Sequence, residues 1–121
     1  MTKVLHIDSS ARVAGSISRD LSAEVVGKFP GARVIHRDVG VNALPHITDP
    51  WVTATFTPAE ARSFEQKEVL AQSDTLVDEL LDADTIVIGV SMYNFSVPAS
   101  LKAWVDMVAR PGRTFNYTET G

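Results

Sequence analysis

The segment TIVIGVS, residues 85–91, constrains the fold of this chain more than any other part of its sequence. It is apolar at nearly every position, as is typical of a strand in a parallel sheet that is covered on both faces. Two parallel neighbours need a crossover between them, and that crossover is usually a helix. The segment therefore predicts an α/β fold in which this strand is central.

Strand and helix patterns alternate along the rest of the chain. The alternation predicts right-handed crossovers and a parallel sheet. No fourth strand follows the third, although an apolar strand at a sheet edge would invite pairing with another chain. Part of the sheet is therefore expected to be missing or supplied by a partner. Strands are predicted at residues 3–8, 32–37 and 85–91, and amphipathic helices at 16–29, from 58 to about 82, and from Pro98 onward.

Turn and cap residues decide two details of this assignment. The segment 38–57 is predicted to be a loop because Gly, Asn, Asp and Pro residues are scattered through it. The following helix is predicted to begin at a capping box formed by Thr57 and Glu60, with Pro58 at its first position. A break in that helix is expected near residues 72–74, where the sequence reads QSD.

The composition excludes several classes of protein. The chain of 121 residues has the length of one domain, and its net charge of −4 provides no basic surface for nucleic acid or membrane. Because it contains no cysteine, it has no disulfide, no thiolate nucleophile and no cysteine-ligated metal. The amino terminus lacks the pattern of a signal peptide, and no apolar run approaches the roughly 20 residues of a membrane span. A cytoplasmic location is therefore expected.

The loop after the first strand, DSSARVAGSIS at residues 8–18, is rich in hydroxyl groups and leads into a helix. Free backbone N–H groups and the helix dipole at that point favour an anion such as a phosphate, and Ser9, Ser10, Ser16 and Ser18 offer further donors. The loop is neither a Walker A motif nor a Gly-x-Gly-x-x-Gly fingerprint. On the residues alone, a second interpretation stands beside this one, in which Ser16 only caps the helix.

The loop after the third strand contains Met92, Tyr93, Asn94 and Phe95 between a buried-looking strand and a helix. Bulky amphipathic side chains in such a loop offer a flat apolar surface, and their backbone groups offer hydrogen bonds at its edge. A planar heteroaromatic ring fits that description. Alternatively, Tyr93 and Phe95 fill the core beneath the sheet.

Other chemistries are disfavoured by spacing. Ser91 lies in a stretch that resembles a serine-hydrolase elbow, but the second glycine of Gly-x-Ser-x-Gly is missing. The widely spaced His6, His36 and His46 show no local ligand pattern, which favours structural roles and no metal site. Asp8 ends a strand as in phospho-receiver domains, but the neighbouring acid is absent.

These segments together carry a likeness to a known family. The chain resembles the FMN-dependent azoreductases, also called FMN-dependent NADH:quinone oxidoreductases, which have the flavodoxin-like fold. The likeness extends over essentially the whole chain, and its most specific element is Met-Tyr-Asn-Phe after an apolar strand. It rests on three stretches: KVLHIDSS…GSIS at the start, TP…LAQSDTLVDELLDADTIVIGVSMYNFSVPASLKAWVD in the middle, and RPGRTFNYTETG at the end.

The resemblance implies a fold and its extent. The family's sheet has five strands in the order 2-1-3-4-5. Residues 1–121 would then be the N-terminal part of a single doubly wound flavodoxin-like domain, with three strands in the order 2-1-3. The fourth strand, its flavin loop and the fifth strand have no counterpart here, and the segment 51–56 differs from the family's loop. The chain is therefore expected to be a truncated or degraded form of a longer enzyme, or one partner of a swapped assembly.

The resemblance also implies a site. Ser10 and the turn formed by Ser16, Ile17 and Ser18 would bind the phosphate and ribityl chain of FMN. The segment from Met92 through Tyr93 and Asn94 to Phe95 would embrace the isoalloxazine ring, with backbone groups facing its N5 edge. Tyr117 falls where the family places an aromatic residue on the substrate side of the flavin.

The activity implied by the resemblance is that of an oxidoreductase in which the flavin carries the chemistry, so that no catalytic side chain and no metal are expected. NADH would reduce FMN, and a quinone or azo compound would then accept two electrons in a ping-pong sequence. A homodimer is implied, with the flavin near the subunit interface. The alternative is a flavin-binding or purely structural module without catalysis.

Overall fold

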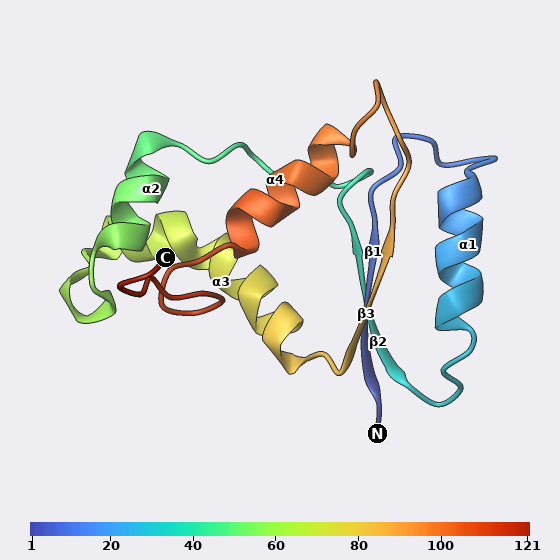
Figure 1. The fold of residues 1–121 in the computed structure, drawn as a ribbon, viewed down its shortest axis with the longest axis horizontal. Helices are drawn as coiled ribbons and strands as arrows, with labels where there is room; N and C mark the ends of the chain where they lie inside the picture. Colours follow the sequence, from blue (N-terminus) through green and yellow to red (C-terminus); the bar gives the residue numbers. More distant parts are fainter.

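A computed structural model describes residues 1–121, and it contains a parallel sheet between two layers of helices (Figure 1). Helix α1 covers one face of the sheet, and α2, α3 and α4 lie on the other side (Figure 1). The elements are β1 (Lys3–Asp8), α1 (Ile17–Val26), β2 (Arg33–Asp38), α2 (Asp49–Phe56), a short 3-10 helix (Ala59–Ala61), α3 (Phe64–Asp82), β3 (Thr85–Gly89) and α4 (Ala99–Val108).

The strand order confirms the prediction for the fold. The three strands are parallel in the order β2-β1-β3, as in the first three strands of a flavodoxin-like sheet. Lys3 pairs with Arg33, and Val4 pairs with Thr85, so all three strands run in step and end at one edge. No helix of the structure combines the length and the apolar composition that crossing a membrane requires.

The main core lies between the sheet and the helices α3 and α4. Strand β1 is central, and its Leu5 and Ile7 are almost completely buried. They belong to one apolar cluster with Leu76 and Val77 of α3 and Trp104 of α4. Burial of a large apolar side chain contributes about 1.5–3 kcal/mol, so this cluster stabilises the packing of the sheet against α3 and α4.

The position of β3 differs from the prediction made for residues 85–91. The apolar run predicted a central strand covered on both faces, but β3 is an edge strand and ends at Gly89. Ile86 and Ile88 are about two-fifths exposed, whereas Val87 is buried on the side of α1. An apolar run shows that a strand is built to be covered, but it does not show whether a neighbour is present in the same chain.

Helix α2 contradicts the prediction of a loop over 38–57. Thr48 caps it by accepting a hydrogen bond from the backbone N–H of Trp51, and a proline occupies the first turn. Trp51 and Ala54 are buried against Leu70 of α3 in a small second cluster. The scattered Pro and Asp residues are helix-start residues here, and packing against α3 stabilises a helix whose local sequence is ambiguous.

The predicted capping box of the next helix is also wrong. Ser63 and Gln66 form it: each side chain accepts from the backbone N–H of the other residue. Thr57 ends α2 instead and donates its hydroxyl hydrogen to the carbonyl of Thr53. Helix α3 then continues without a break through residues 72–74, because Ser73 is buried and donates to the carbonyl of Met107 on α4.

Candidate functional site

The carboxyl ends of β1 and β3 lie next to each other, because Asp8 pairs with Gly89 at the end of both strands. The first rim loop (residues 9–16) and the second rim loop (residues 90–98) therefore leave the sheet at the same edge, at the top of Figure 1. The hydroxyl of Ser9 donates to the carbonyl of Gly89 at 2.7 Å and so connects the start of the first rim loop to the end of β3. In open α/β sheets, ligands bind at this edge.

A pocket of about 380 Å³ opens between the two rim loops and the start of α1. Its lining unites residues of the first loop and the start of α1 with three residues of the second loop, of which Tyr93 is the one predicted from the sequence. A larger hollow of about 590 Å³ lies at the opposite, amino-terminal end of the strands, away from both loops. The residues that line the smaller pocket are Ser10, Arg12, Gly15, Ser16, Ile17, Ser18, Leu21, Val90, Ser91 and Tyr93.

The hydroxyl groups of the pocket are ordered by the start of α1. Ser16 is the N-cap, with its Oγ accepting from the N–H of Arg19 at 3.3 Å, and it also lies 3.3 Å from the hydroxyl of Ser18. The Ser18 hydroxyl in turn lies 2.9 Å from that of Ser91 on the second rim loop. Ser16 therefore both caps α1 and lines the pocket. The first N–H groups of a helix lack partners within it, so this end of the pocket suits an anion.

The two arginines of this region have different roles. Arg19 is mostly buried and donates to both carboxylate oxygens of Asp38, at 2.5 and 3.1 Å, and to the carbonyls of Ser10 and Arg12. The hydrogen bond from Arg19 holds the pKa of Asp38 below its usual value and raises that of Arg19. Arg12 is exposed, lines the pocket, and its guanidinium has no hydrogen-bond or ion-pair partner. Arg19 therefore shapes the loop, and Arg12 is the free cation beside it.

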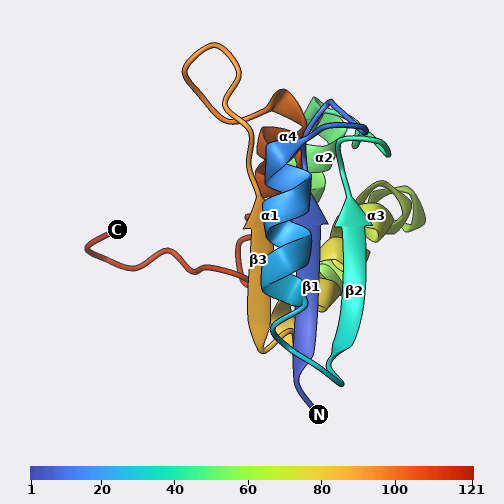
Figure 2. The ribbon, with the colours of Figure 1, turned by 90° about the vertical axis from the view of Figure 1, so that its right-hand side faces the viewer.

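The second rim loop projects from the molecule as a tight turn (Figure 2). Tyr93 and Ser96 exchange two backbone hydrogen bonds, and the residues between them, Asn94 and Phe95, have φ values of 51° and 68°. The left-handed conformation costs a non-glycine residue about 1–2 kcal/mol. The Phe95 side chain is 97% exposed and that of Met92 is 72% exposed. The alternative in which Tyr93 and Phe95 fill the core is therefore wrong.

Tyr93 connects the two rim loops. Its hydroxyl accepts from the N–H of Ala11 at 3.1 Å and lies 3.5 Å from the hydroxyl of Ser10. These hydrogen bonds, that with Ser10 first, lower the pKa of Tyr93. Asn94, Met92 and Phe95 do not line the pocket, and all three are exposed.

The structure does not bring Tyr117 to this site. The tail that contains it lies beyond the end of α4 that points away from the rim (Figure 1). Tyr117 is 69% exposed and packs edge-on against Phe115, with ring centroids 5.2 Å apart. Tyr117 is not among the residues that line the pocket between the two rim loops.

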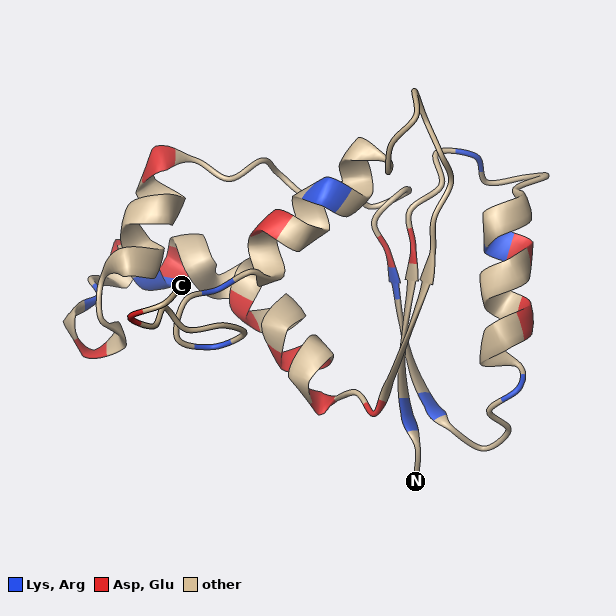
Figure 3. Ribbon diagram, in the orientation of Figure 1, with Lys and Arg blue, Asp and Glu red and all other residues tan.

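A polar cluster that the sequence did not predict lies beneath α1, beside the rim. His6 and His36 are paired across β1 and β2, and their rings stack with centroids 4.5 Å apart. Both rings approach the buried carboxylate of Asp8, and burial lowers the pKa of His6. Figure 3 marks acidic positions at the carboxyl ends of both strands. The sequence alone did not reveal the cluster, because the pairing of the two histidines depends on the parallel register of β1 and β2.

Comparisons with known proteins agree with this geometry. The profile of a family described as "Flavodoxin-like fold" matches residues 2–121. The chain is 54% identical to the FMN-dependent NADH:quinone oxidoreductase 1 of Jannaschia sp. (strain CCS1) and 50% identical to the FMN-dependent NADH:quinone oxidoreductase of Herminiimonas arsenicoxydans. Both matches include 100% of this chain, but 62% and 61% of those relatives.

The same relation holds for a solved structure. The azoreductase from Bacillus anthracis str. Sterne is 28% identical, with a TM-score of 0.87 over 100% of this chain and 62% of that chain. The chain thus spans less than two thirds of the length of each of these proteins. This extent agrees with the prediction that only part of the family's sheet is present here.

Proposed function

Because the chain belongs to the family with the flavodoxin-like fold, we propose that its carboxyl rim binds FMN and that the protein passes two electrons from NADH to quinones and azo compounds. The observation that carries the proposal is the pocket in which the capped start of α1 meets Tyr93 of the second rim loop. One end of that pocket suits an anion, and its other end borders exposed apolar side chains. The names of the matched relatives supply the donor, the cofactor and the quinone.

The phosphate and ribityl chain of FMN are assigned to the first rim loop and the start of α1. Ser16, Ile17 and Ser18 present hydroxyl and N–H groups there, and Ser10 lies at the base of the pocket. Arg12 is added to the predicted residues, because it is the cation of the pocket lining that no carboxylate neutralises. Hydrogen bonds between a phosphate and charged or backbone donors are stronger than those between neutral groups.

The flavin ring is assigned to the second rim loop. Met92 and Phe95 offer apolar surface, and the turn at Asn94 keeps the loop projecting beside the pocket. When bound, FMN supplies the two-electron chemistry in ping-pong order, so the residues of this chain orient it and need no nucleophile. The two reciprocal hydrogen bonds of the turn, between Tyr93 and Ser96, hold that surface in one shape.

A homodimer is part of the proposal. Tyr117 does not line the pocket, and the tail that contains it leaves the end of α4 that points away from the rim, so we assign it to the substrate side of the flavin of a second molecule (Figure 1).

The proposal is tested by adding FMN to the purified chain and following the quenching of flavin fluorescence. NADH should then bleach the 1:1 complex, and a quinone should restore its colour. Ser18→Ala should weaken FMN binding, because Ser18 lines the pocket, whereas Thr75→Ala on the exposed face of α3 should not. Binding without bleaching would favour the non-catalytic flavin module, and the absence of saturable quenching would refute the assignment of the rim.

A further inference from the structure

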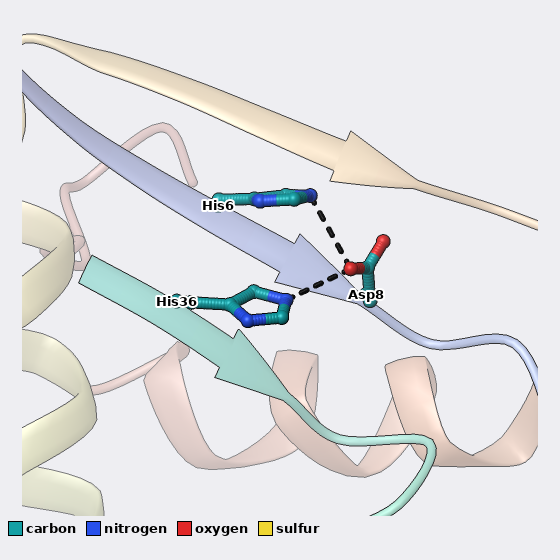
Figure 4. A group of neighbouring side chains, drawn as sticks. All are labelled: His6, Asp8 and His36. Carbon is teal, nitrogen blue, oxygen red and sulfur yellow. Dashed lines mark hydrogen bonds and ion pairs between the residues drawn. The ribbon is translucent and has the colours of Figure 1, made fainter. Parts of the chain in front are cut away.

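The polar cluster beneath α1 has the composition of a metal site. His6 and Asp8 lie on β1 and His36 lies on β2, and Figure 4 shows both rings directed at the same carboxylate. One ligand atom of each residue lies within 4.8 Å of the other two. We propose that His6, Asp8 and His36 bind a divalent transition-metal ion of the Zn²⁺ type.

The distances match those between ligands of one metal ion. Nε2 of His36 lies 2.8 Å from Oδ2 of Asp8, and Nε2 of His6 lies 3.3 Å from the same oxygen. Bonds of about 2.0–2.2 Å from Zn²⁺ to nitrogen and oxygen place neighbouring ligand atoms roughly 3 Å apart. The strand register therefore brings the three ligand atoms within 4.8 Å of one another, and binding requires the stacked imidazoles to turn so that both lone pairs point at one ion.

The surroundings orient the carboxylate. Ser22 donates its hydroxyl hydrogen to Oδ1 of Asp8 at 2.7 Å, which leaves Oδ2 facing the two imidazoles. Hydrogen bonds from neighbouring groups commonly orient metal-ligating carboxylates in this way. The Ser22 oxygen also lies 2.9 Å from Nε2 of His6, and this nitrogen exchanges that contact for the ion when the metal binds.

The charge of Asp8 favours a cation at this place. The carboxylate side chain is only 6% exposed, and a buried carboxylate needs a compensating charge. Arg19 is the nearest fixed cation, but its Nη1 is 4.0 Å from Asp8 and 2.5 Å from Asp38, which already neutralises it. A divalent ion between the imidazoles would supply the charge that Asp8 lacks.

Access and ligand type narrow the choice of ion. The His36 side chain is 50% exposed, whereas those of His6 and Asp8 are below 10%, so the site opens to solvent on the side of β2. Three protein ligands and an open position are typical of a zinc site that also holds water. Two imidazoles select zinc, nickel, cobalt or copper over magnesium and calcium, which prefer oxygen.

The test uses the tag-free chain without FMN, so its outcome is independent of the proposed function. Zn²⁺ is titrated against a competing chelator, and the imidazole proton resonances are followed by NMR. The chain has only three histidines and no cysteine, so each resonance can be assigned. One Zn²⁺ should bind per chain, moving the resonances of His6 and His36 and leaving that of the exposed His46 in place.

Two matched variants complete the test. His36→Gln should weaken Zn²⁺ binding at least about tenfold, since a ligand is lost, and His46→Gln should leave the affinity unchanged. Because the NMR measurement is made on the unmodified chain, it remains decisive if a variant folds poorly. Binding with unchanged affinity in His36→Gln, equal shifts of all three histidines, or no shift at one equivalent of Zn²⁺ would overturn the proposal.

Discussion

The two rim loops leave neighbouring strands at the same edge of the sheet, yet they are held in opposite ways. The first loop is anchored at its two ends, while residues 11–15 between them are exposed: Ser10 and Ser16 are buried, and the guanidinium of Arg19 binds the carbonyls of Ser10 and Arg12. The second loop projects into solvent with Phe95 almost fully exposed (Figure 2). Apart from the reciprocal bonds of its turn, its hydrogen bonds come chiefly from the Tyr93 hydroxyl and from Ser91.

This difference suits two chemically different parts of one ligand. An anion leaves water at a high cost, which is offset only by donors that are fixed before it arrives. A flat apolar ring needs surface, and burying that surface is favourable without directional contacts. The contrast between the loops therefore supports an assignment of the phosphate to the first loop and the ring to the second.

The largest effect is expected when the first loop is displaced. A Cβ atom on Gly40 would lie 2.2 Å from the carbonyl oxygen of Ser10, so Gly40→Ala should lower the free energy of unfolding by about 1–3 kcal/mol. FMN affinity should fall with it. Urea denaturation measures the change, with Gly27→Ala as the control, because that position has ordinary helical φ and a nearest contact of 3.3 Å. Equal stability of the two variants would show that the first rim loop moves away from a Cβ atom at position 40 at little cost in free energy.

The ion pair behind the first loop should give a smaller, pH-dependent effect. The hydrogen bond from Arg19 lowers the pKa of Asp38, so the folded state binds fewer protons there than the unfolded chain. This stability is complete above the unfolded pKa of about 3.9 and is lost as the pH falls through the folded pKa.

Asp38→Asn should therefore lower the free energy of unfolding by about 1–2 kcal/mol at pH 7. The difference from the wild type should begin to shrink below about pH 4, where the unfolded carboxyl takes up its proton, and should continue to shrink until the folded carboxyl is neutral as well. Urea denaturation in EDTA at both pH values measures it. A difference that is the same at pH 7 and pH 3.5 would show that the charge of Asp38 is not what holds Arg19.

Ligand selectivity separates the two loops directly. Riboflavin has the ring of FMN but no phosphate. Ser18→Ala should lower the affinity for FMN by about 1 kcal/mol, or roughly fivefold, and lower that for riboflavin less, because riboflavin keeps the ribityl chain but lacks the phosphate. Met92→Ala should weaken both ligands to a similar extent, because Met92 belongs to the proposed ring surface. Fluorescence titrations measure the affinities of both variants for FMN and for riboflavin. If Met92→Ala selectively weakened FMN and Ser18→Ala weakened both ligands equally, the phosphate would belong to the second loop and the ring to the first.

The smallest effect is expected at the strained turn. Phe95 has a φ of 68° and is almost fully exposed, so Phe95→Gly removes strain and no buried contact. The free energy of unfolding should rise by up to about 1 kcal/mol, while flavin affinity falls. Thermal unfolding and flavin titration check the two effects, with Asn94→Gly as the matched control for the backbone. A loss of both stability and affinity would mean that Phe95 has a structural role.

Much of the fold follows from local sequence patterns. The bounds of β1 were predicted as residues 3–8, and the other strands differed by one or two residues. Both rim loops were located, because each follows an apolar run and precedes a helix. The features that were missed, α2 and the capping box at Ser63, have patterns that occur more than once in the same stretch. For α2, the packing of Trp51 against Leu70 of α3 decides that this stretch is a helix.

The sequence by itself determined the alternation of strands and helices, because residue periodicity is a local property of the backbone. The tertiary structure decided which residues meet. Parallel register placed His6 beside His36, although 30 positions separate them in the chain, and it brought Tyr93 to Ser10 at the rim. It also placed β3 at an edge and Tyr117 away from the pocket. Such distances depend on how packed layers set strand order, and no local pattern in the chain contains that information.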